Sequence, residues 1–271
     1  MNPTPQFITS RDNAQIKLLR RLAQDNTACR QQARVWLEGD HLCRAALARG
    51  RVPSLAVFTE AAWSETGGHW GQVLTDLPLS HASPTPAPPD ILVLPESLMA
   101  SLSGLESPSP MAFVVPLPVL PQGVLPGQSA VVLDRVQDAG NVGSILRSAS
   151  AFGFAQVLAL KGTASLWSPK VVRAGMGAHF GLHLVEGLTP DDLRDLNLPL
   201  LVTSSHAGDA VHERRWPWPC VWAFGHEGQG VGEALMASAS QQVRIAQPGG
   251  EESLNVAAAA AICLYASVAG R

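Results

Sequence analysis

The feature that most constrains the fold is a series of short, continuously apolar segments in the second half of the chain. Residues 130–133, 156–159 and 221–224 read as buried strands, and helical periodicity covers 141–153 and 169–175. Strands that are apolar on both faces are typical of parallel sheets with helices on either side. The second half therefore predicts an α/β domain with a mostly parallel sheet. The same pattern predicts further strands at 182–185 and 199–203, and further helices from about 190 and over about 253–269.

The first half of the chain predicts a smaller α/β sandwich. Apolar runs at 35–37, 55–58 and 91–94 read as strands, and a helix is expected to end near Arg49. The helix expected over 13–24 is amphipathic. Its inner face holds Ile16, Leu19, Leu22 and Ala23, and its outer stripe holds Lys17, Arg20, Arg21 and Gln24.

Proline and glycine mark the boundaries between these parts. Segments 84–89 and 116–127 are rich in proline, which breaks helices and central strands. We expect a first domain at 1–116, a linker at 117–128 and a second domain at 129–271.

Charge and cysteine content narrow the class of protein. The net charge is −3, but residues 1–60 carry nine basic and five acidic side chains, which makes that segment about +4. Most of the basic residues are arginine, whose planar fork suits phosphate, although a solvated arginine-rich surface explains them equally well. The four cysteines form no C-x-x-C pair, so neither zinc nor a disulfide framework is expected. Nothing resembles a signal peptide or a membrane span, and a cytoplasmic protein is expected.

The loop after the strand at 130–133 has the sequence DRVQDAGNVGSILR and reads as a glycine turn that opens a helix. Gly140 is expected to form the turn and Asn141 to cap the helix. Gly143 lies four residues before Arg147, and is expected to leave open space for an anion at the helix start. An ordinary cap with a solvated arginine explains this loop better when it is considered alone.

The loop FGHEGQG at 224–230 has three glycines in six residues after a strand. Glycines let a ligand approach the backbone closely. Glu227 would repel a phosphate, and suits a ribose hydroxyl, an ammonium group or an arginine. The Gly-Lys-Ser/Thr ending of a Walker loop and the spacing of a dinucleotide fingerprint are both missing. A tight turn that glycine merely permits is the alternative.

The third segment, RIAQPGGEESLNVAAAAAICLYA, joins a strand to the last helix. Ser253 is expected to cap this helix, and Glu251 and Glu252 to favour its dipole. The expected buried face comprises Leu254, Ala257, Ala258, Ala261, Leu264, Tyr265 and Val268.

Together, the three segments closely resemble the motifs of the SpoU (TrmH-like) branch of the SPOUT RNA methyltransferases. The first motif, N-x-G-x-x-x-R, is matched by Asn141, Gly143 and Arg147. The glycine-glutamate-glycine motif is matched at 225–230, and the S-L-N-V motif at 253–256. Their order and spacing fit across about 130–271, and residues 168–180 resemble the linking segment of the family. Residues 7–50 also resemble the substrate-binding domain that precedes the catalytic domain in many ribosomal-RNA members.

The sequence departs from the family pattern at three positions, which concern loop geometry and not the proposed catalytic groups. Proline is common in the family where Ala139 stands, asparagine where His226 stands, and serine where Gly175 stands.

The resemblance implies a deep trefoil knot, a homodimer and S-adenosylmethionine-dependent methyl transfer to a ribose 2′-hydroxyl without a metal. The RNA is expected to be ribosomal, with transfer RNA as the rival substrate, because the first domain is often absent from shorter transfer-RNA members. The implied catalytic residues are Asn141, Arg147, Glu227, Ser253 and Asn255. The expected cofactor contacts are Thr203, Ser204, Gly225, Ile245 and Leu254. The residues expected to contact RNA are Arg11, Lys17, Arg20, Arg21 and Arg147.

Two questions stay open at the level of sequence. The first is whether Arg147 accepts the proton of the hydroxyl or only holds a phosphate, since a guanidinium resists deprotonation. The second is whether the fold is catalytic at all. The rivals are a non-catalytic RNA-binding protein, disfavoured by the intact polar set, and a nucleotide-binding oxidoreductase, disfavoured by the missing fingerprint.

Overall fold

The structure is a computed structural model that describes residues 4–77, 88–118, 123–204, 207–249 and 253–269. The chain divides into two compact units, which we describe separately. The first comprises Met1–Pro118 with the short segment Trp167–Pro169, and the second comprises Val119–Leu166 and Lys170–Arg271. Parts of the expected loop at 84–89 and of the linker, as well as Glu251 and Glu252, lie outside the described residues.

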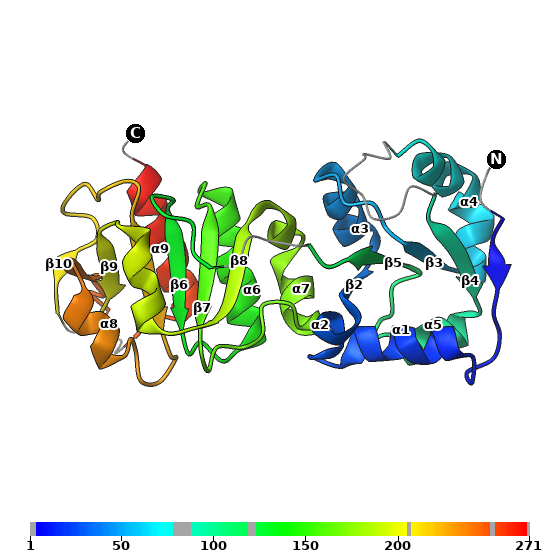
Figure 1. The fold of residues 1–271 in the computed structure, drawn as a ribbon, viewed down its shortest axis with the longest axis horizontal. Helices are drawn as coiled ribbons and strands as arrows, with labels where there is room; N and C mark the ends of the chain where they lie inside the picture. The colour runs from blue at the N-terminus through cyan, green and yellow to red at the C-terminus, as the bar shows by residue number, and fades with distance from the viewer. Residues whose placement is uncertain (1–3, 78–87, 119–122, 205–206, 250–252, 270–271) are drawn as a thin grey trace. The chain divides into compact units, whose positions relative to one another are not determined.

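The first unit is built on a five-stranded mixed sheet with the order β1-β4-β3-β5-β2 (Figure 1). Strand β2 pairs antiparallel with β5, and β3 pairs parallel with β4. The strands are β1 (Gln6–Phe7), β2 (Arg34–Glu38), β3 (Leu55–Thr59), β4 (Asp90–Leu94) and β5 (Met111–Pro116). The helices are α1 (Ala14–Gln24), α2 (Ala28–Gln32), α3 (Asp40–Ala48), α4 (Glu60–Thr75) and α5 (Glu96–Leu102).

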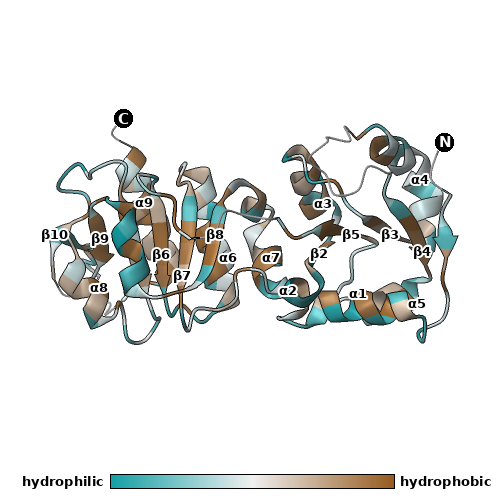
Figure 2. Cartoon of the chain, viewed as in Figure 1, coloured by the Kyte–Doolittle hydropathy of each residue, from teal (hydrophilic) through white to brown (hydrophobic). Residues whose placement is uncertain are grey.

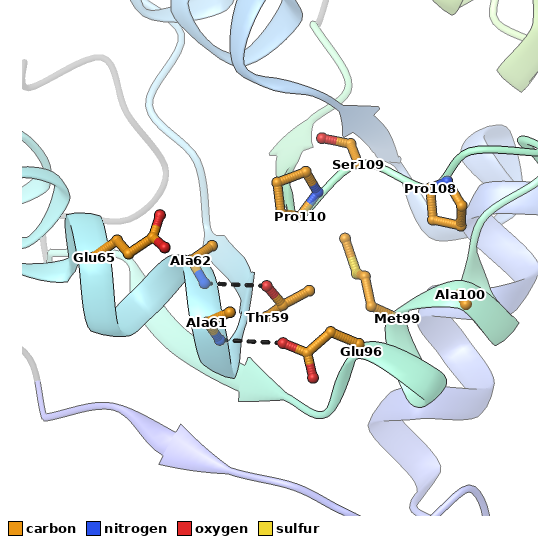
Figure 3. A pocket seen from close by; sticks show the side chains of 10 residues that line it. All are labelled: Thr59, Ala61, Ala62, Glu65, Glu96, Met99, Ala100, Pro108, Ser109 and Pro110. Carbon is orange, nitrogen blue, oxygen red and sulfur yellow. Dashed lines mark hydrogen bonds between the residues drawn. The ribbon is translucent and has the colours of Figure 1, made fainter.

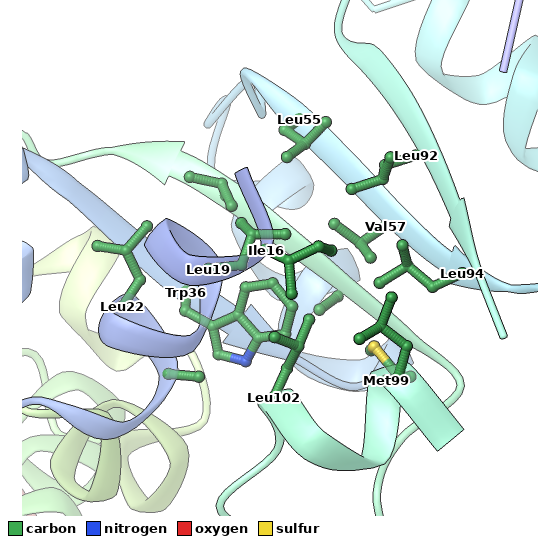
Figure 4. Packing of buried hydrophobic residues seen from close by; sticks show 14 of the residues in the cluster. Ile16, Leu19, Leu22, Trp36, Leu55, Val57, Leu92, Leu94, Met99 and Leu102 are labelled. Atoms are coloured by element: carbon green, nitrogen blue, oxygen red, sulfur yellow. The ribbon is translucent and has the colours of Figure 1, made fainter. Parts of the chain in front are cut away.

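Helix α1 covers this sheet with the face that its periodicity predicts. Ile16, Leu19, Leu22 and Ala23 are all buried, and they join Trp36 in one hydrophobic cluster (Figure 4). The Asn13 side chain accepts a hydrogen bond from the Gln15 N–H and so caps the helix. The prediction for this helix is confirmed in both bounds and orientation.

The second unit is built on a seven-stranded sheet with the order β10-β12-β9-β11-β6-β7-β8. All pairings between its described strands are parallel, as predicted. The strands are β6 (Ala130–Asp134), β7 (Gln156–Leu160), β8 (His183–Leu188), β9 (Leu200–Thr203), β10 (Asp209–Ala210), β11 (Val221–Gly225) and β12 (Gln241–Arg244). The helices are α6 (Ala139–Ala151), α7 (Pro169–Gly175), α8 (Glu233–Ser238) and α9 (Val256–Val268), with 3₁₀ turns at Ala178–Gly181 and Pro190–Leu196.

The central strands of the second unit are buried along their whole length. Every residue of β6, β7 and β11 is buried, which agrees with continuous apolar strands in a doubly covered sheet. Figure 2 shows β6 and most of β7 as hydrophobic. Strand β12 is the strand that the third segment was expected to follow, whereas β10, which has only two residues, was not expected. The trefoil knot stays a prediction.

Candidate active site

The first two loops meet because their strands are neighbours. Strands β6 and β11 pair in register, and their last residues, Asp134 and Gly225, lie opposite each other. The loop that opens α6 and the loop FGHEGQG therefore leave the same edge of the sheet side by side. This edge carries the carboxyl ends of the strands, where parallel sheets bind ligands.

Helix α6 is capped by a different residue from the one expected. The Asp138 carboxylate accepts a hydrogen bond from the Asn141 N–H at 2.8 Å, and the helix begins at Ala139. Gly140 thus lies in the first helical turn and not in a preceding turn. The prediction that Asn141 caps the helix is wrong, because aspartate and asparagine cap about equally well and Asp138 comes first. As a result, the Asn141 amide remains available for the site.

Glu227 anchors the glycine loop onto the start of α6. Its carboxylate accepts hydrogen bonds from the backbone N–H groups of Gln137 at 3.2 Å and Asp138 at 3.1 Å, and from Nδ2 of Asn141 at 3.1 Å. Partial burial raises the pKa of Glu227, but the hydrogen bonds led by that of Asn141 outweigh it, so the pKa is lowered overall. The carboxylate is therefore held in its ionised form.

Asn255 joins the third segment to the same group. Its Nδ2 donates to Oδ1 of Asn141 at 2.9 Å, while its Oδ1 accepts from the N–H groups of Ala257 and Ala258. Asn255 is thus the cap of α9, which begins at Val256. The prediction that Ser253 caps this helix is wrong, since Ser253 lies before the cap and is exposed. No hydrogen bond joins Ser253 to another described residue.

Gly143 has a packing role in place of the expected open space. A Cβ atom at this position would lie 2.4 Å from the Ala174 Cβ and 2.9 Å from the Gly175 nitrogen. Gly143 is therefore the point where α6 approaches the end of α7 closely. The prediction of an anion cavity above Arg147 at this glycine is wrong, because the neighbouring backbone fills the space.

Arg147 is exposed on α6, about 9 Å along the helix axis from Asn141. Within the described part of the chain, no hydrogen bond or ion pair holds its guanidinium. The structure brings Asn141, Glu227 and Asn255 together, but does not join Arg147 to them. The exposed Arg147 side chain is therefore available to bind a ligand.

The glycine loop is a tight, self-bonded turn. The N–H of His226 donates to the Gly230 carbonyl at 3.0 Å, and the N–H of Gly230 donates back at 2.8 Å. A Cβ on Gly225 would lie about 2.1 Å from the Gly230 carbonyl carbon, so only glycine permits this turn. Nδ1 of His226 accepts from the N–H groups of Gly228 and Gln229. His226 therefore stabilises the turn by accepting hydrogen bonds, which an asparagine side chain could also do.

The residues expected to contact the cofactor lie in four chain segments, three of which lie at the ends of the neighbouring strands β12, β9 and β11. Thr203 ends β9 and its hydroxyl donates to the Ala223 carbonyl, while the N–H of Ser204 donates to the Val243 carbonyl. Ile245 follows β12 and is half-buried, and Leu254 is 39% exposed although it is large and apolar. Segments 225–230, 245–249 and 253–255 hold no lysine or arginine. The backbone groups and apolar side chains of these segments suit a nucleoside with a sulfonium group.

Helix α9 does not bury the face that was expected. Its buried residues are Ala260, Cys263, Leu264 and Ser267, whereas Tyr265 is 58% and Ile262 40% exposed. Of the expected face, Leu264 alone is fully buried. The helix is apolar all round, so its sequence has no period that distinguishes an inner from an outer face. Two large apolar side chains therefore face solvent in the single chain.

The N-terminal basic residues differ in how far they are engaged. Nε and Nη2 of Arg20 donate to the backbone and the hydroxyl of Ser101 on α5. Nη2 of Arg21 donates to Gln31, and Lys17 pairs with Asp12 at 3.4 Å. Arg11 and Lys17 are exposed. Arg20 thus has a structural role within the unit.

The first unit also contains an open pocket of about 400 Å³. It lies between the start of α4, helix α5 and the segment at 108–110, and Figure 3 shows Glu96 accepting a hydrogen bond from the Ala61 N–H there. Its lining is mainly apolar, with Glu65 and Glu96 as the charged groups. None of the predicted site residues lines it.

Asp138 is a site residue that sequence reasoning missed. It caps α6, and its other oxygen pairs with Nζ of Lys170 at 3.5 Å. The pKa of Asp138 is lowered, first by the hydrogen bond from the Asn141 N–H and then by Lys170. The signal was present in the sequence as an Asx residue three positions before Asn141.

Comparisons with known proteins agree with this geometry. The model of the SpoU rRNA Methylase family matches residues 128–265. An uncharacterized tRNA/rRNA methyltransferase of Synechocystis sp. is 30% identical over 263 residues, which cover 95% of this chain and 92% of the relative. The crystal structure of an RNA 2′-O ribose methyltransferase superposes with a TM-score of 0.79 at 29% identity, covering 97% of this chain and 98% of that one.

A third likeness shows the fold alone. The AdoMet-bound rRNA methyltransferase of Sinorhizobium meliloti has a TM-score of 0.79 at 23% identity, and 97% of each chain is covered. The two-unit architecture of the present chain is therefore found along the full length of solved structures. No helix in the described parts of the chain is long and apolar enough to cross a membrane.

Proposed function

The chain belongs to the SpoU rRNA Methylase family of RNA 2′-O-ribose methyltransferases, and on this premise we propose that it methylates a ribose 2′-hydroxyl of ribosomal RNA. The observation that carries the proposal is the hydrogen-bonded group of Asn141, Glu227 and Asn255. These residues come from three separated motifs, and they meet at the carboxyl edge of the parallel sheet. A chance resemblance of sequence would not bring them together.

S-adenosylmethionine is the proposed methyl donor, and when bound it supplies a methyl group already activated by the sulfonium. We assign its contacts to Thr203, Ser204, Gly225, Ile245 and Leu254. The absence of lysine and arginine from the glycine loop and from the segment around Leu254 supports this choice over a phosphorylated cofactor. The exposed Leu254 side chain supplies an apolar surface of the kind that an adenine ring requires.

The substrate half of the site is assigned to α6. Arg147 holds the phosphate and ribose of the target nucleotide, and its planar fork suits both groups. Family precedent makes this arginine the base, but the resistance of a guanidinium to deprotonation favours the holding role. Alignment of the hydroxyl with the methyl group then contributes most of the rate. Asn141 orients the 2′-oxygen, since Glu227 and Asn255 fix both ends of its amide, while Ser253 and Asn255 shape the site from the cofactor side.

The first unit is proposed to bind the RNA, with Arg11, Lys17, Arg20 and Arg21 as candidate contacts. The family model, which describes rRNA methylases, supports ribosomal RNA. Among these contacts, Arg20 is expected to contribute least, because Ser101 already accepts two of its donors. Transfer RNA is the alternative substrate, in keeping with the tRNA/rRNA description of the Synechocystis relative.

We also propose a homodimer that covers the exposed side of α9. Ile262 and Tyr265 present apolar surface there, and Phe152 of α6 packs on the Tyr265 ring with a centroid distance of 5.7 Å. Exposed apolar side chains that lie on one face of a helix suit a subunit interface. The four cysteines are buried and form no disulfide, which suits a reducing compartment, and we propose the cytoplasm.

Mapping of ribose methylation in cellular RNA, with and without the gene, tests the proposed reaction. A single 2′-O-methyl group that disappears from ribosomal RNA is the expected result, and its loss from transfer RNA instead would select the alternative. Calorimetry on the purified protein tests the cofactor. Binding of S-adenosylmethionine in the absence of metal is expected, and tight binding of NAD would overturn the proposal.

A further inference from the structure

Arg135 follows the last residue of β6 in an unusual backbone conformation. Its φ is +60°, which is rare and strained for residues other than glycine. None of the three motifs includes this arginine. A strained residue at the edge of a binding site calls for a physical reason.

The strained conformation folds the side chain of Arg135 back over its neighbour, Asp134. Nε of Arg135 donates to Oδ1 of Asp134 at 3.0 Å, and Nη2 donates to Oδ2 at 3.2 Å. Asp134 is buried at 5% exposure, and its Oδ2 also accepts from the Gly232 N–H at 2.6 Å. The bidentate pair thus neutralises a buried carboxylate that holds the far end of the glycine loop.

The third guanidinium nitrogen of Arg135, Nη1, reaches the glycine loop itself. Nη1 donates to Oε1 of Gln229 at 2.9 Å. Gln229 stands two residues after Glu227, which is tied to the start of α6. The loop after β11 is therefore held at two points, by Glu227 on one side and by Arg135 on the other.

The loop after β7 supports the same arginine. The hydroxyl of Thr163 accepts from the Arg135 N–H at 3.0 Å and donates to the Leu133 carbonyl at 2.9 Å. A Cβ on Gly162 would lie 3.1 Å from the Cγ of Arg135, so this glycine leaves room for the arginine stem. Arg135 is therefore the residue at which the loops after three parallel strands meet.

We propose that Arg135, paired with Asp134, is a positioning residue that sets the shape of the loop at 225–230 for the cofactor. This inference rests on the proposed function, since that loop is the assigned cofactor half of the site. Arg135 acts through Gln229 and Gly232, and it is not assigned any contact with RNA or with the methyl group. Its loss should weaken cofactor binding more than it slows the methyl transfer step.

The test compares two substitutions that differ in backbone strain. Arg135→Gly removes the guanidinium but adopts a φ of +60° without strain, whereas Arg135→Ala removes the guanidinium and keeps the strain. Both should raise the Kd and KM for S-adenosylmethionine about tenfold, the loss expected for a charge-assisted contact, with kcat within about threefold. Both should also lower the melting temperature, because the buried Asp134 carboxylate loses its partner, and Arg135→Ala should lower it further because it keeps the strained backbone. Equal cofactor affinity of Arg135→Gly and the wild type would overturn the proposal.

Further variants separate geometry from charge. Arg135→Lys keeps the charge without the fork, and should recover less than half of the lost binding free energy. Gln229→Ala should raise the KM for the cofactor a few-fold, and should add little in the Arg135→Gly background because both act on one contact. Additive effects would contradict the shared contact. Lys161→Ala, an exposed lysine in the loop after β7, is the charge-matched control.

The outcome is distinguishable from a failure of the proposed function. If the wild-type protein does not bind S-adenosylmethionine in calorimetry, the proposed cofactor is wrong. If the wild type binds it and Arg135→Gly binds it equally well, the cofactor assignment stands and the role of Arg135 is wrong.

Discussion

The two helices that begin at the candidate site, α6 and α9, use similar residues in different ways. Each has an Asx cap and contributes an asparagine to the polar group. In α6 the cap and the site residue are separate, because Asp138 caps and Asn141 reaches Glu227. In α9 a single residue, Asn255, does both.

The exposed faces of the two helices differ as well. Beyond its first turn, α6 exposes Ser144 and Arg147, whereas α9 exposes Ile262 and Tyr265. The exposed face of α6 suits a charged ligand, and that of α9 suits a protein surface. We therefore propose that α6 contributes to the reaction and that α9 contributes to the subunit interface.

Replacement of Arg147 should have the largest effect, because no other described cation lies on the exposed side of α6. Arg147→Ala should lower turnover at least about 1,000-fold, the combined size of lost positioning and lost charge. Cofactor affinity in calorimetry and dimer mass should be unchanged. Ser144→Ala on the same helix is the control. Turnover within tenfold of the wild type would remove Arg147 from the chemistry.

Substitutions at Asn255 should separate its two roles. Asn255→Asp keeps the cap but replaces the donor to Asn141 with a carboxylate, so turnover should fall about 100-fold while the free energy of unfolding changes by less than about 0.5 kcal/mol. Asn255→Ala should lose both the turnover and about 1 kcal/mol of stability. If Asn255→Asp is as active as the wild type, the hydrogen bond from Asn255 to Asn141 does not contribute to the reaction.

A charge on the exposed side of α9 should weaken the proposed dimer. Ile262→Glu should raise the dimer dissociation constant about 30-fold, because burial of an isoleucine side chain is worth about 2 kcal/mol. Sedimentation at several concentrations measures this change. Ala237→Glu on α8, which is also exposed, is the matched control. A wild-type protein that sediments as a monomer would show that this face has another partner or none.

A change of pH within the neutral range should have the smallest effect, because the Glu227 carboxylate that is hydrogen-bonded to the start of α6 stays ionised there. The pKa of Glu227 is lowered on folding, so its contribution is complete above the unfolded value near 4.5 and is lost only as the pH falls through the lower folded value. The difference in free energy of unfolding between the wild type and Glu227→Gln should therefore be constant from pH 8 to about pH 5 and shrink below that. A difference that changes between pH 8 and pH 6 would contradict the ionised network.

Sequence alone predicted the parallel sheet, the inner face of α1 and the edge at which the three motifs meet. These features follow from local periodicity or from strand order. The space around Gly143 could not be predicted, because the atoms that fill it belong to Ala174, 31 residues later. The inner face of α9 could not be predicted because an apolar helix has no distinguishing period.

The choice of caps failed for a different reason. Asp138 and Asn141 are both good capping residues, as are Ser253 and Asn255, and propensity does not rank them. Arg135 was missed because its importance lies in a positive φ and in contacts with Asp134 and Gln229, none of which leaves a pattern in sequence.

The dual role of Asn255 limits how far α9 can slide. The hydrogen bond to Asn141 measures 2.9 Å, and a displacement of the helix by the rise of a single residue, about 1.5 Å, would stretch it beyond bonding distance. The cap would travel with the helix and remain intact, so the helix itself would show no damage. An axial shift of α9 would then lower the rate of methyl transfer, while the helical content and the unfolding temperature would stay the same.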